Sequence, residues 1–232
     1  MWIGVICQGC TDVSLDRYSV SPSKCNLFST NFDASHFVGC SGLIELHDCT
    51  FSRQMDDGLN VHGIYTTVES VVGNMITVKY NHMQHKGADL FSEGDELLIR
   101  TNDTLKITER VRIDSVCVLN RDYALLTVSG NYESIKCGML VDNVTKSPSV
   151  KVSGCTFEQN RARGILLAAS GDILIENNRF HVPGAAILLE SDSYYWYESG
   201  AIKNLVIRNN EFCDCAYRSE WGEAVISVVL RL

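Results

Sequence analysis

The stretch that decides the fold is ILIENNRF, residues 173–180, in which a short apolar strand leads through an asparagine step to a phenylalanine. The same order of residue types recurs at 44–51 (IELHDCTF), 150–157 (VKVSGCTF) and 205–212 (LVIRNNEF). A polar turn and a second apolar strand follow each copy, at 59–61, 165–167, 187–189 and 225–227. Where no loop intervenes, the repeat length is about 23 residues, and such a period is the signature of a solenoid.

Short strands at this period, with asparagine at the corners, predict an all-β fold, a right-handed parallel β-helix. Each coil pairs its backbone with the coils above and below, about 4.8 Å apart. We expect inward Phe, Ile, Leu and Cys side chains to stack in columns and corner Asn side chains to bond neighbouring backbone. A leucine-rich repeat is the competing fold, but its Leu-x-x-Leu-x-Leu frame is absent. Residues 13–20 form an earlier, less regular copy.

The repeat is interrupted between Gly63 and about Ser147. Two apolar strands around Gly73-Asn74 have the pattern of a hairpin, and three more alternating strands follow. The sequence therefore predicts a small antiparallel β-barrel inserted between two coils. The expected division is 1–63 for the first coils, 64–147 for the inserted barrel and 148–232 for the second coils.

Composition excludes several classes of protein. The chain has 20 Lys+Arg against 28 Asp+Glu, a formal charge of −8, which argues against nucleic-acid binding because no basic patch is available for phosphates. No apolar run reaches the roughly 20 residues of a membrane span. The 10 cysteines include a single Cys-x-x-Cys pair, Cys7 and Cys10, and a metal cluster usually needs a second such pair, so we expect buried free thiols and no metal cluster.

The densest polar cluster is QMDDGLNVHG, residues 54–63. Strand alternation turns Leu59 and Val61 inward, which directs Asn60 and His62 outward. Because a bare carboxylate inside a coil is costly, the adjacent aspartates, residues 56–57, are expected on the turn before the strand. There both carboxylates reach solvent, and each raises the pKa of the other.

Stacking of coils brings further polar residues toward this cluster. The coil below supplies Asp33 and His36, the coil above supplies Arg161 and Arg163, and two coils above come Glu190, Trp196 and Glu198. Aromatic faces stack on sugar rings while carboxylates, amides and imidazoles bond hydroxyls, so the mixture suits a carbohydrate site. For the aromatic run 194–197, a hydrophobic lid or a protein contact is an equal alternative.

Two carboxyl groups across a glycosidic bond are the minimal machinery of glycoside hydrolysis. Asp33 lies one coil from Asp56 and Asp57, and a separation of about 6.5–9.5 Å, typical of inverting enzymes, is expected. Glu190 and Glu198 are the alternative acids by geometry.

Residues 31–37, 42–44, 56–63 and 195–200 resemble glycoside hydrolase family 110. These are bacterial exo-α-galactosidases that act on terminal α-1,3-linked galactose, including blood-group B epitopes. The resemblance implies an inverting mechanism without metal or cofactor, with Asp33 as general acid and Asp56 or Asp57 as the base that activates water. The expected substrate-binding residues are His36, Asn60, His62, Arg161, Arg163, Glu190, Trp196 and Glu198.

The resemblance covers most of this chain but only part of a family member, so a fragment lacking the N-terminal portion is expected. It implies a glycan with terminal galactose as partner, no membrane insertion, and a periplasmic or secreted full-length protein, with a homodimer left open. Two alternatives stay open. A polysaccharide lyase or pectinase-like enzyme would need a Lys or Arg base and often calcium, whereas a non-catalytic carbohydrate-binding solenoid would release no product.

Overall fold

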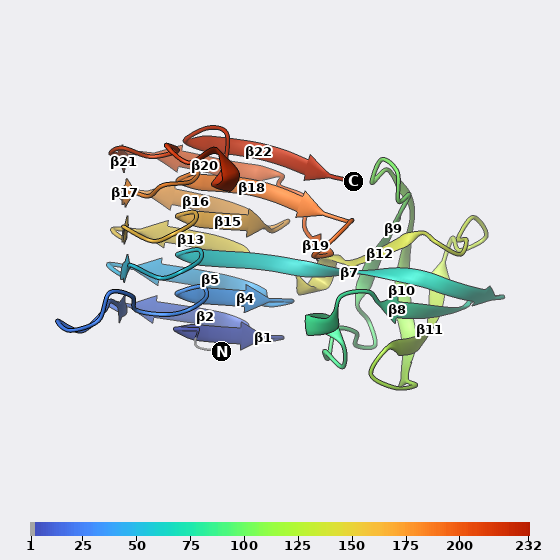
Figure 1. The fold of residues 1–232 in the computed structure, drawn as a ribbon. Helices are drawn as coiled ribbons and strands as arrows, with labels where there is room; N and C mark the ends of the chain where they lie inside the picture. The colour runs from blue at the N-terminus through green and yellow to red at the C-terminus, as the bar shows by residue number, and fades with distance from the viewer. Residues whose placement is uncertain (1–2) are drawn as a thin grey trace. The chain divides into compact units, whose positions relative to one another are not determined.

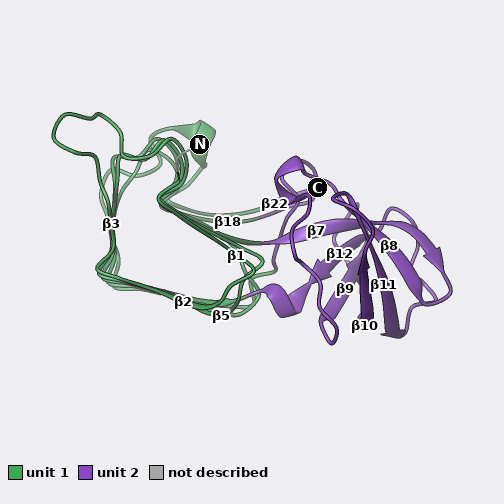
Figure 2. Ribbon diagram, turned by 90° about the horizontal axis from the view of Figure 1, so that it is seen from below, with its two compact units in different colours: residues 1–62, 148–190, 201–229 green, residues 63–147, 191–200, 230–232 purple. Residues whose placement is uncertain are grey.

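The computed structural model describes residues 3–232 and contains two compact units. The first comprises residues 1–62, 148–190 and 201–229, and the second comprises residues 63–147, 191–200 and 230–232 (Figure 2). Residues 191–200, which the sequence analysis grouped with the second coils, belong to the second unit.

The first unit is a parallel β-helix whose strands stack in three sheets (Figure 1). One sheet contains β2 (Thr11–Asp16), β5 (Ser41–His47), β13 (Ser149–Ser153), β16 (Asp172–Glu176) and β20 (Asn204–Arg208). The second contains β3 (Ser19–Val20), β6 (Thr50–Ser52), β14 (Thr156–Glu158), β17 (Arg179–His181) and β21 (Glu211–Phe212). The third contains β1 (Val5–Gln8), β4 (Ser35–Val38) and β15 (Ile165–Ala168), together with the parts within this unit of β7 (Leu59–Val72), β18 (Ile187–Asp192) and β22 (Ile226–Arg231). The predicted solenoid is confirmed.

The coils before and after the insertion pair directly with each other. β5 pairs β13 in parallel, with Leu46 opposite Val152, and β6 pairs β14 with Phe51 opposite Phe157. β7 pairs β15 in the same way. The long interruption in the sequence therefore leaves the register of the stack unchanged, and polar residues far apart along the chain are placed one coil apart.

A column of phenylalanines fills the interior of the coils. The rings of Phe51, Phe157, Phe180 and Phe212 follow one another with centroid separations of 5.3, 5.0 and 5.3 Å. The first three are fully buried, and aromatic pairs at such distances contribute about 0.5–1.5 kcal/mol each beyond the area they bury. The predicted inward column is confirmed.

The asparagine step has a left-handed backbone in successive coils. The φ angle is 68° at Gly154 and 56° at both Asn177 and Asn209, a region that Gly and Asn tolerate best. At the next position the Asn210 amide donates to the backbone oxygen of Ile175 at 2.8 Å, as expected for corner asparagines. The step thus turns the chain and joins neighbouring coils.

A pair of stacked glycines stands just before the third sheet, where the coils approach most closely. A Cβ on Gly164 would lie 2.5 Å from the backbone oxygen of Ala186 and 2.8 Å from Phe180 Cδ1. One on Gly58 would lie 2.5 Å from Phe157 Cδ1. These contacts are too short for any side chain, so the glycines set the spacing between the phenylalanine column and the third sheet.

We expect Gly164→Ala to lower the free energy of unfolding by about 1–3 kcal/mol, because the added methyl group overpacks the coil interior. Urea denaturation measures this change. Gly73→Ala is the control: it adds the same methyl group where nothing lies within 4 Å, at a φ of +60°. Its cost is backbone strain alone, and an equal loss in both variants would contradict the overpacking argument.

The second unit contains a closed antiparallel barrel, as predicted. Its strand order is β12-β9-β10-β11-β8-β7, closed by pairing of β12 with β7. Besides β7, the barrel contains β8 (Met75–Tyr80), β9 (Glu96–Arg100), β10 (Ile107–Val118), β11 (Tyr123–Gly130) and β12 (Leu140–Asn143). The same unit holds η1 (Met83–His85), η2 (Val144–Lys146) and β19 (Glu198–Ser199), and η3 (Ser219–Trp221) belongs to the first unit. Within residues 3–232, no helix has the length and apolar character needed to cross a membrane.

All ten cysteines are free thiols. Cys40, Cys49 and Cys155 are buried in the coil core, where burial raises the pKa of Cys40 to about 11 and that of Cys155 to about 12. The expectation of burial is wrong for three others, because Cys25, Cys117 and Cys137 are exposed.

Candidate active site

A column of three charged residues stands at the turns that lead into β4, β7 and β15. The N–H of Asp57 donates to Oδ1 of Asp33 at 3.1 Å, and the N–H of Arg163 donates to Oδ1 of Asp57 at 3.0 Å. Each aspartate therefore accepts a backbone N–H from the next coil. Stacking brings these residues together even though Asp57 and Arg163 are 106 positions apart.

Asp57 is buried, which corrects the expectation that its carboxylate reaches solvent. Its side chain is 2% exposed, and its Oδ1 also accepts a hydrogen bond from Nε of Arg163 at 2.8 Å. The burial that we expected to be too costly is offset because a guanidinium, itself only 16% exposed, pairs with the carboxylate. Burial disfavours the charge of Arg163, but Asp57, Asp56 and Glu190 outweigh this effect and raise its pKa.

Asp33, Asp56 and Asp57 bring one carboxyl oxygen each to within 4.8 Å of one another. Burial raises the pKa of Asp56 to about 7, the charges of Asp57 and Asp33 add to this increase, and Arg163 and Arg161 oppose it. Burial also raises the pKa of Asp57, against the influence of Arg163. The predicted effect of Asp57 on Asp56 is confirmed, although burial is the larger cause.

One oxygen of each carboxyl group lies this close to the others because the turns that hold the three side chains stack on one another. The expected separation of about 6.5–9.5 Å between the carboxyl groups stays a prediction. Three such oxygens also have the spacing of a cation site. Arg163 already provides a positive charge next to Asp57.

The carboxyl group of Asp33 contacts His36, which in turn contacts His62. Nδ1 of His36 lies 2.8 Å from Oδ2 of Asp33, and Nε2 of His36 lies 2.8 Å from Nε2 of His62. An ionised Asp33 requires His36 to donate from Nδ1, so the Nε2 of a neutral His36 accepts from Nε2–H of His62. The two predicted substrate-binding histidines thus share a network with Asp33, and His36 lies on β4 of the coil below.

Asn60 and Glu190 lie on the outer face of the third sheet and are also buried. Asn60 is 5% exposed, and its Oδ1 has no hydrogen-bond partner among residues 3–232. Glu190 is 7% exposed and follows Leu189, which pairs with Leu167 of β15. The charge of Glu190 contributes to the raised pKa of Arg163, so Glu190 lies within electrostatic reach of this arginine, the partner of Asp57.

Trp221 covers the two predicted arginines. The guanidinium carbon of Arg161 lies 5.0 Å from the Trp221 ring centroid, and that of Arg163 lies 5.6 Å from it, within cation–π distance. Sequence reasoning missed this tryptophan because η3, the short 3-10 helix between β21 and β22 that holds it, has no periodic pattern. The available signal was an isolated Trp in a polar turn.

Trp196 and Glu198 belong to the second unit. The Trp196 ring is 42% exposed and lies 5.0 Å from that of His82. Oδ1 of Asp192 accepts N–H groups from residues 194–196 and orders this loop. Glu198, on β19, pairs with Ile64 of β7. The expected placement of both residues beside the aspartates stays a prediction.

A family described as "Right handed beta helix region" matches residues 108–225, half of the chain. The chain belongs to the right-handed β-helix family. Its match begins on β10 of the inserted barrel and continues through the three coils that follow. The predicted handedness of this β-helix is thereby confirmed.

Curated relatives of this β-helix chain share one name. It is 36% identical to "Alpha-1,3-galactosidase A" of Shewanella woodyi, over 94% of this chain and 36% of that protein. It is 34% identical to "Alpha-1,3-galactosidase A" of Akkermansia muciniphila (98% and 38%), and 30% identical to "Alpha-1,3-galactosidase B" of Bacteroides thetaiotaomicron (97% and 38%). The predicted resemblance to α-1,3-galactosidases is confirmed, and the chain spans little more than a third of these relatives' length.

Proposed function

We propose that this protein is a glycoside hydrolase that removes terminal α-1,3-linked galactose from glycans. The observation that carries the proposal is the cluster of Asp33, Asp56 and Asp57. Their three carboxyl groups come from two coils, and that of Asp56 has a pKa of about 7. Such a cluster offers both a proton and a negative charge at neutral pH. The similarity to α-1,3-galactosidases supplies the sugar and the linkage.

Asp56 is the general acid in this proposal. Burial and two neighbouring carboxylates favour its protonated form, which suits a group that donates a proton to the leaving oxygen. Asp57 is held in an ion pair with Arg163, which favours its carboxylate form and opposes the effect of burial. The resemblance to family 110 instead gives the acid role to Asp33, and the two assignments predict different kinetics.

Asp33 is the proposed base that activates water. Its carboxylate is oriented by His36, and His36 is joined to His62, so the network can hold the proton that water releases. Asp57, stacked between Asp33 and Arg163, orients the base by donating its own N–H to Asp33. Asn60 and Glu190, buried on the same face, are proposed to bond galactose hydroxyls.

Inversion and exo action are part of the proposal, as are secretion or a periplasmic location of the full-length protein and a homodimer. The stereochemistry is the sharpest question, because it depends on the separation of the two carboxyl groups: about 6.5–9.5 Å in inverting enzymes and about 5–5.5 Å in retaining ones. The support for inversion is the family resemblance. An inverting enzyme releases β-galactose first from an α-galactoside.

The test is incubation with a panel of glycans bearing terminal α-1,3-, α-1,4- or α-1,6-galactose, with and without adjacent fucose. We expect free galactose from the α-1,3 members, and proton NMR should detect the β-anomer before mutarotation. Early α-anomer would contradict inversion. Binding without released sugar would favour the carbohydrate-binding solenoid, and an unsaturated product would favour the lyase.

A further inference from the structure

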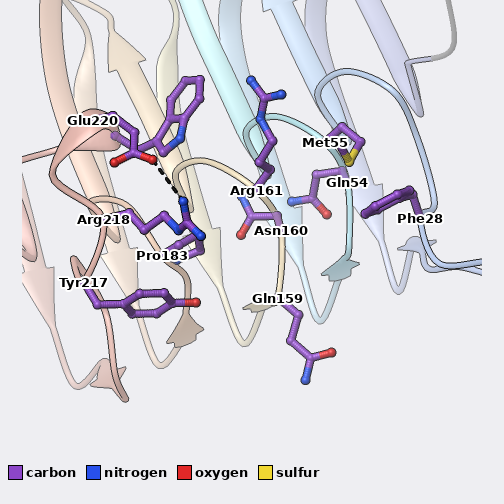
Figure 3. A pocket seen from close by; sticks show the side chains of 11 residues that line it. Phe28, Gln54, Met55, Gln159, Asn160, Arg161, Pro183, Tyr217, Arg218 and Glu220 are labelled. Carbon is purple, nitrogen blue, oxygen red and sulfur yellow. Dashed lines mark hydrogen bonds and ion pairs between the residues drawn. The ribbon is translucent and has the colours of Figure 1, made fainter.

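A groove of about 680 Å³ follows the turns that precede the third sheet of the first unit. Figure 3 shows its lining, with Gln54 and Asn160 adjacent in the middle, Phe28 toward one end and Tyr217 toward the other. These side chains come from the turns of different coils. Four coil steps separate the turn of Phe28 from that of Tyr217, which is about 19 Å at 4.8 Å a step.

Two buried amide side chains in the groove have polar atoms without a hydrogen-bond partner among residues 3–232. Gln54 is 1% exposed, and within residues 3–232 neither its Nε2 nor its Oε1 has a hydrogen-bond partner. Asn160 is 4% exposed, and its Oδ1 is also without one. Buried polar groups in folded proteins are nearly always paired, so these three atoms require an explanation. Polar groups of a bound molecule would supply the missing donors and acceptors.

The other lining residues specify the chemistry of that molecule. Phe28 and Tyr217 expose 52% and 63% of their surface within the lining of the groove, so their rings are accessible to a bound molecule. Arg218 is neutralised by an ion pair with Glu220 at 3.3 Å. Exposed aromatic faces beside amides suit a neutral molecule with apolar ring faces and many hydroxyls, which describes a sugar chain.

The groove adjoins the proposed proton donor. The Asn160 amide donates to the backbone oxygen of Asp56 at 2.9 Å, and the charge of Arg161, which lines the groove, lowers the pKa of Asp56. A general acid protonates the oxygen of the departing group, so the rest of the substrate leaves on the side of Asp56. Resting on the proposed function, we propose that this groove binds the leaving portion of the glycan, at least two sugars beyond the terminal galactose.

The experiment compares kcat/KM for the trisaccharide α-1,3-galactosyl-lactose with that for p-nitrophenyl α-galactoside, whose leaving group is too short to fill the groove. Tyr217→Ala should lower kcat/KM for the trisaccharide about tenfold and change that for the nitrophenyl substrate less than twofold. Gln54→Met should do the same and also raise the thermal midpoint, because it removes an unpaired buried amide at similar volume. Gln8→Met and Tyr132→Ala are the controls: they make the same replacements outside the groove and should leave kcat/KM for both substrates unchanged.

Two failures are distinguishable. In the first, the unaltered protein hydrolyses both substrates while the groove variants keep the same ratio of kcat/KM for the trisaccharide to kcat/KM for the nitrophenyl substrate. That result overturns the groove inference and leaves the proposed function standing. If the protein hydrolyses neither substrate, calorimetric titration with the trisaccharide decides the matter. Binding weakened about tenfold by Tyr217→Ala and Gln54→Met supports the groove without the enzyme, and binding that is absent or unchanged in the variants overturns it.

Discussion

Replacing Asp56 with asparagine should lower kcat on α-1,3-linked glycans by about 10²–10⁴-fold, the usual contribution of a general acid. A sugar alkoxide leaves poorly without a proton, whereas p-nitrophenolate needs little assistance. Asp56→Asn should therefore spare the nitrophenyl substrate, and Asp33→Asn, which removes the base, should impair both substrates. The opposite pattern would return the acid role to Asp33, as the family resemblance implies.

The pH dependence follows from the pKa of Asp56, raised by burial and by neighbouring carboxylates to about 7. Above that pH the acid loses its proton, so kcat/KM should fall, and the fall should be absent in Asp56→Asn. Because the folded state favours the protonated form, this group contributes stability that is fully present below its unfolded pKa and is lost as pH rises through about 7. Asp56→Asn should thus be at least as stable at pH 8, which separates lost chemistry from lost folding.

Arg163→Met should lower the free energy of unfolding by about 3–5 kcal/mol at neutral pH, the largest stability change we expect. The substitution leaves Asp57, 2% exposed, buried without its guanidinium partner. Denaturant unfolding measures the change. The double variant Asp57→Asn/Arg163→Met should recover most of it, because both charges are then gone.

Arg208→Met is the control for this prediction. Arg208 pairs with Glu176 at 2.7 Å, but its side chain is 58% exposed, so its loss should cost about 0–1 kcal/mol. The penalty of Arg163→Met should also shrink in acid, where Asp57 takes up a proton. Equal effects of the two arginine substitutions would show that the Asp57–Arg163 pair is not the buried unit described above.

Much of the first unit was predictable because its coils repeat one pattern. Strand alternation placed Leu59 and Val61 correctly in the core, and Gly73-Asn74 marked the first hairpin of the barrel. The same repeat spacing that aligns Phe51 with Phe157 also places Asp57 beside Arg163. The proximity of Asp57 and Arg163 could therefore have been predicted from the sequence.

The direction of side chains in the turns was not predictable. Alternation fixes which face a strand residue occupies, but it does not extend into the turn that holds Asp57, and its burial depends on a partner one coil away. Gln54 and Trp221 were missed for the same reason. They lie in turns without a periodic pattern, and only the stacked backbone brings them into one groove.

The closure of the inserted barrel has a consequence for how the chain folds. Joining the coil of β6 to that of β14 across roughly 85 intervening residues costs conformational entropy, which grows by only about 0.6 kcal/mol for each doubling of a flexible loop. The contacts within the barrel offset this entropy cost, because β12 pairs with β7 and Asp142 lies opposite Tyr65, which brings the two ends of the insertion together. Once the barrel has formed, its entry and exit strands are already neighbours, so the next coil nucleates as if the loop were short.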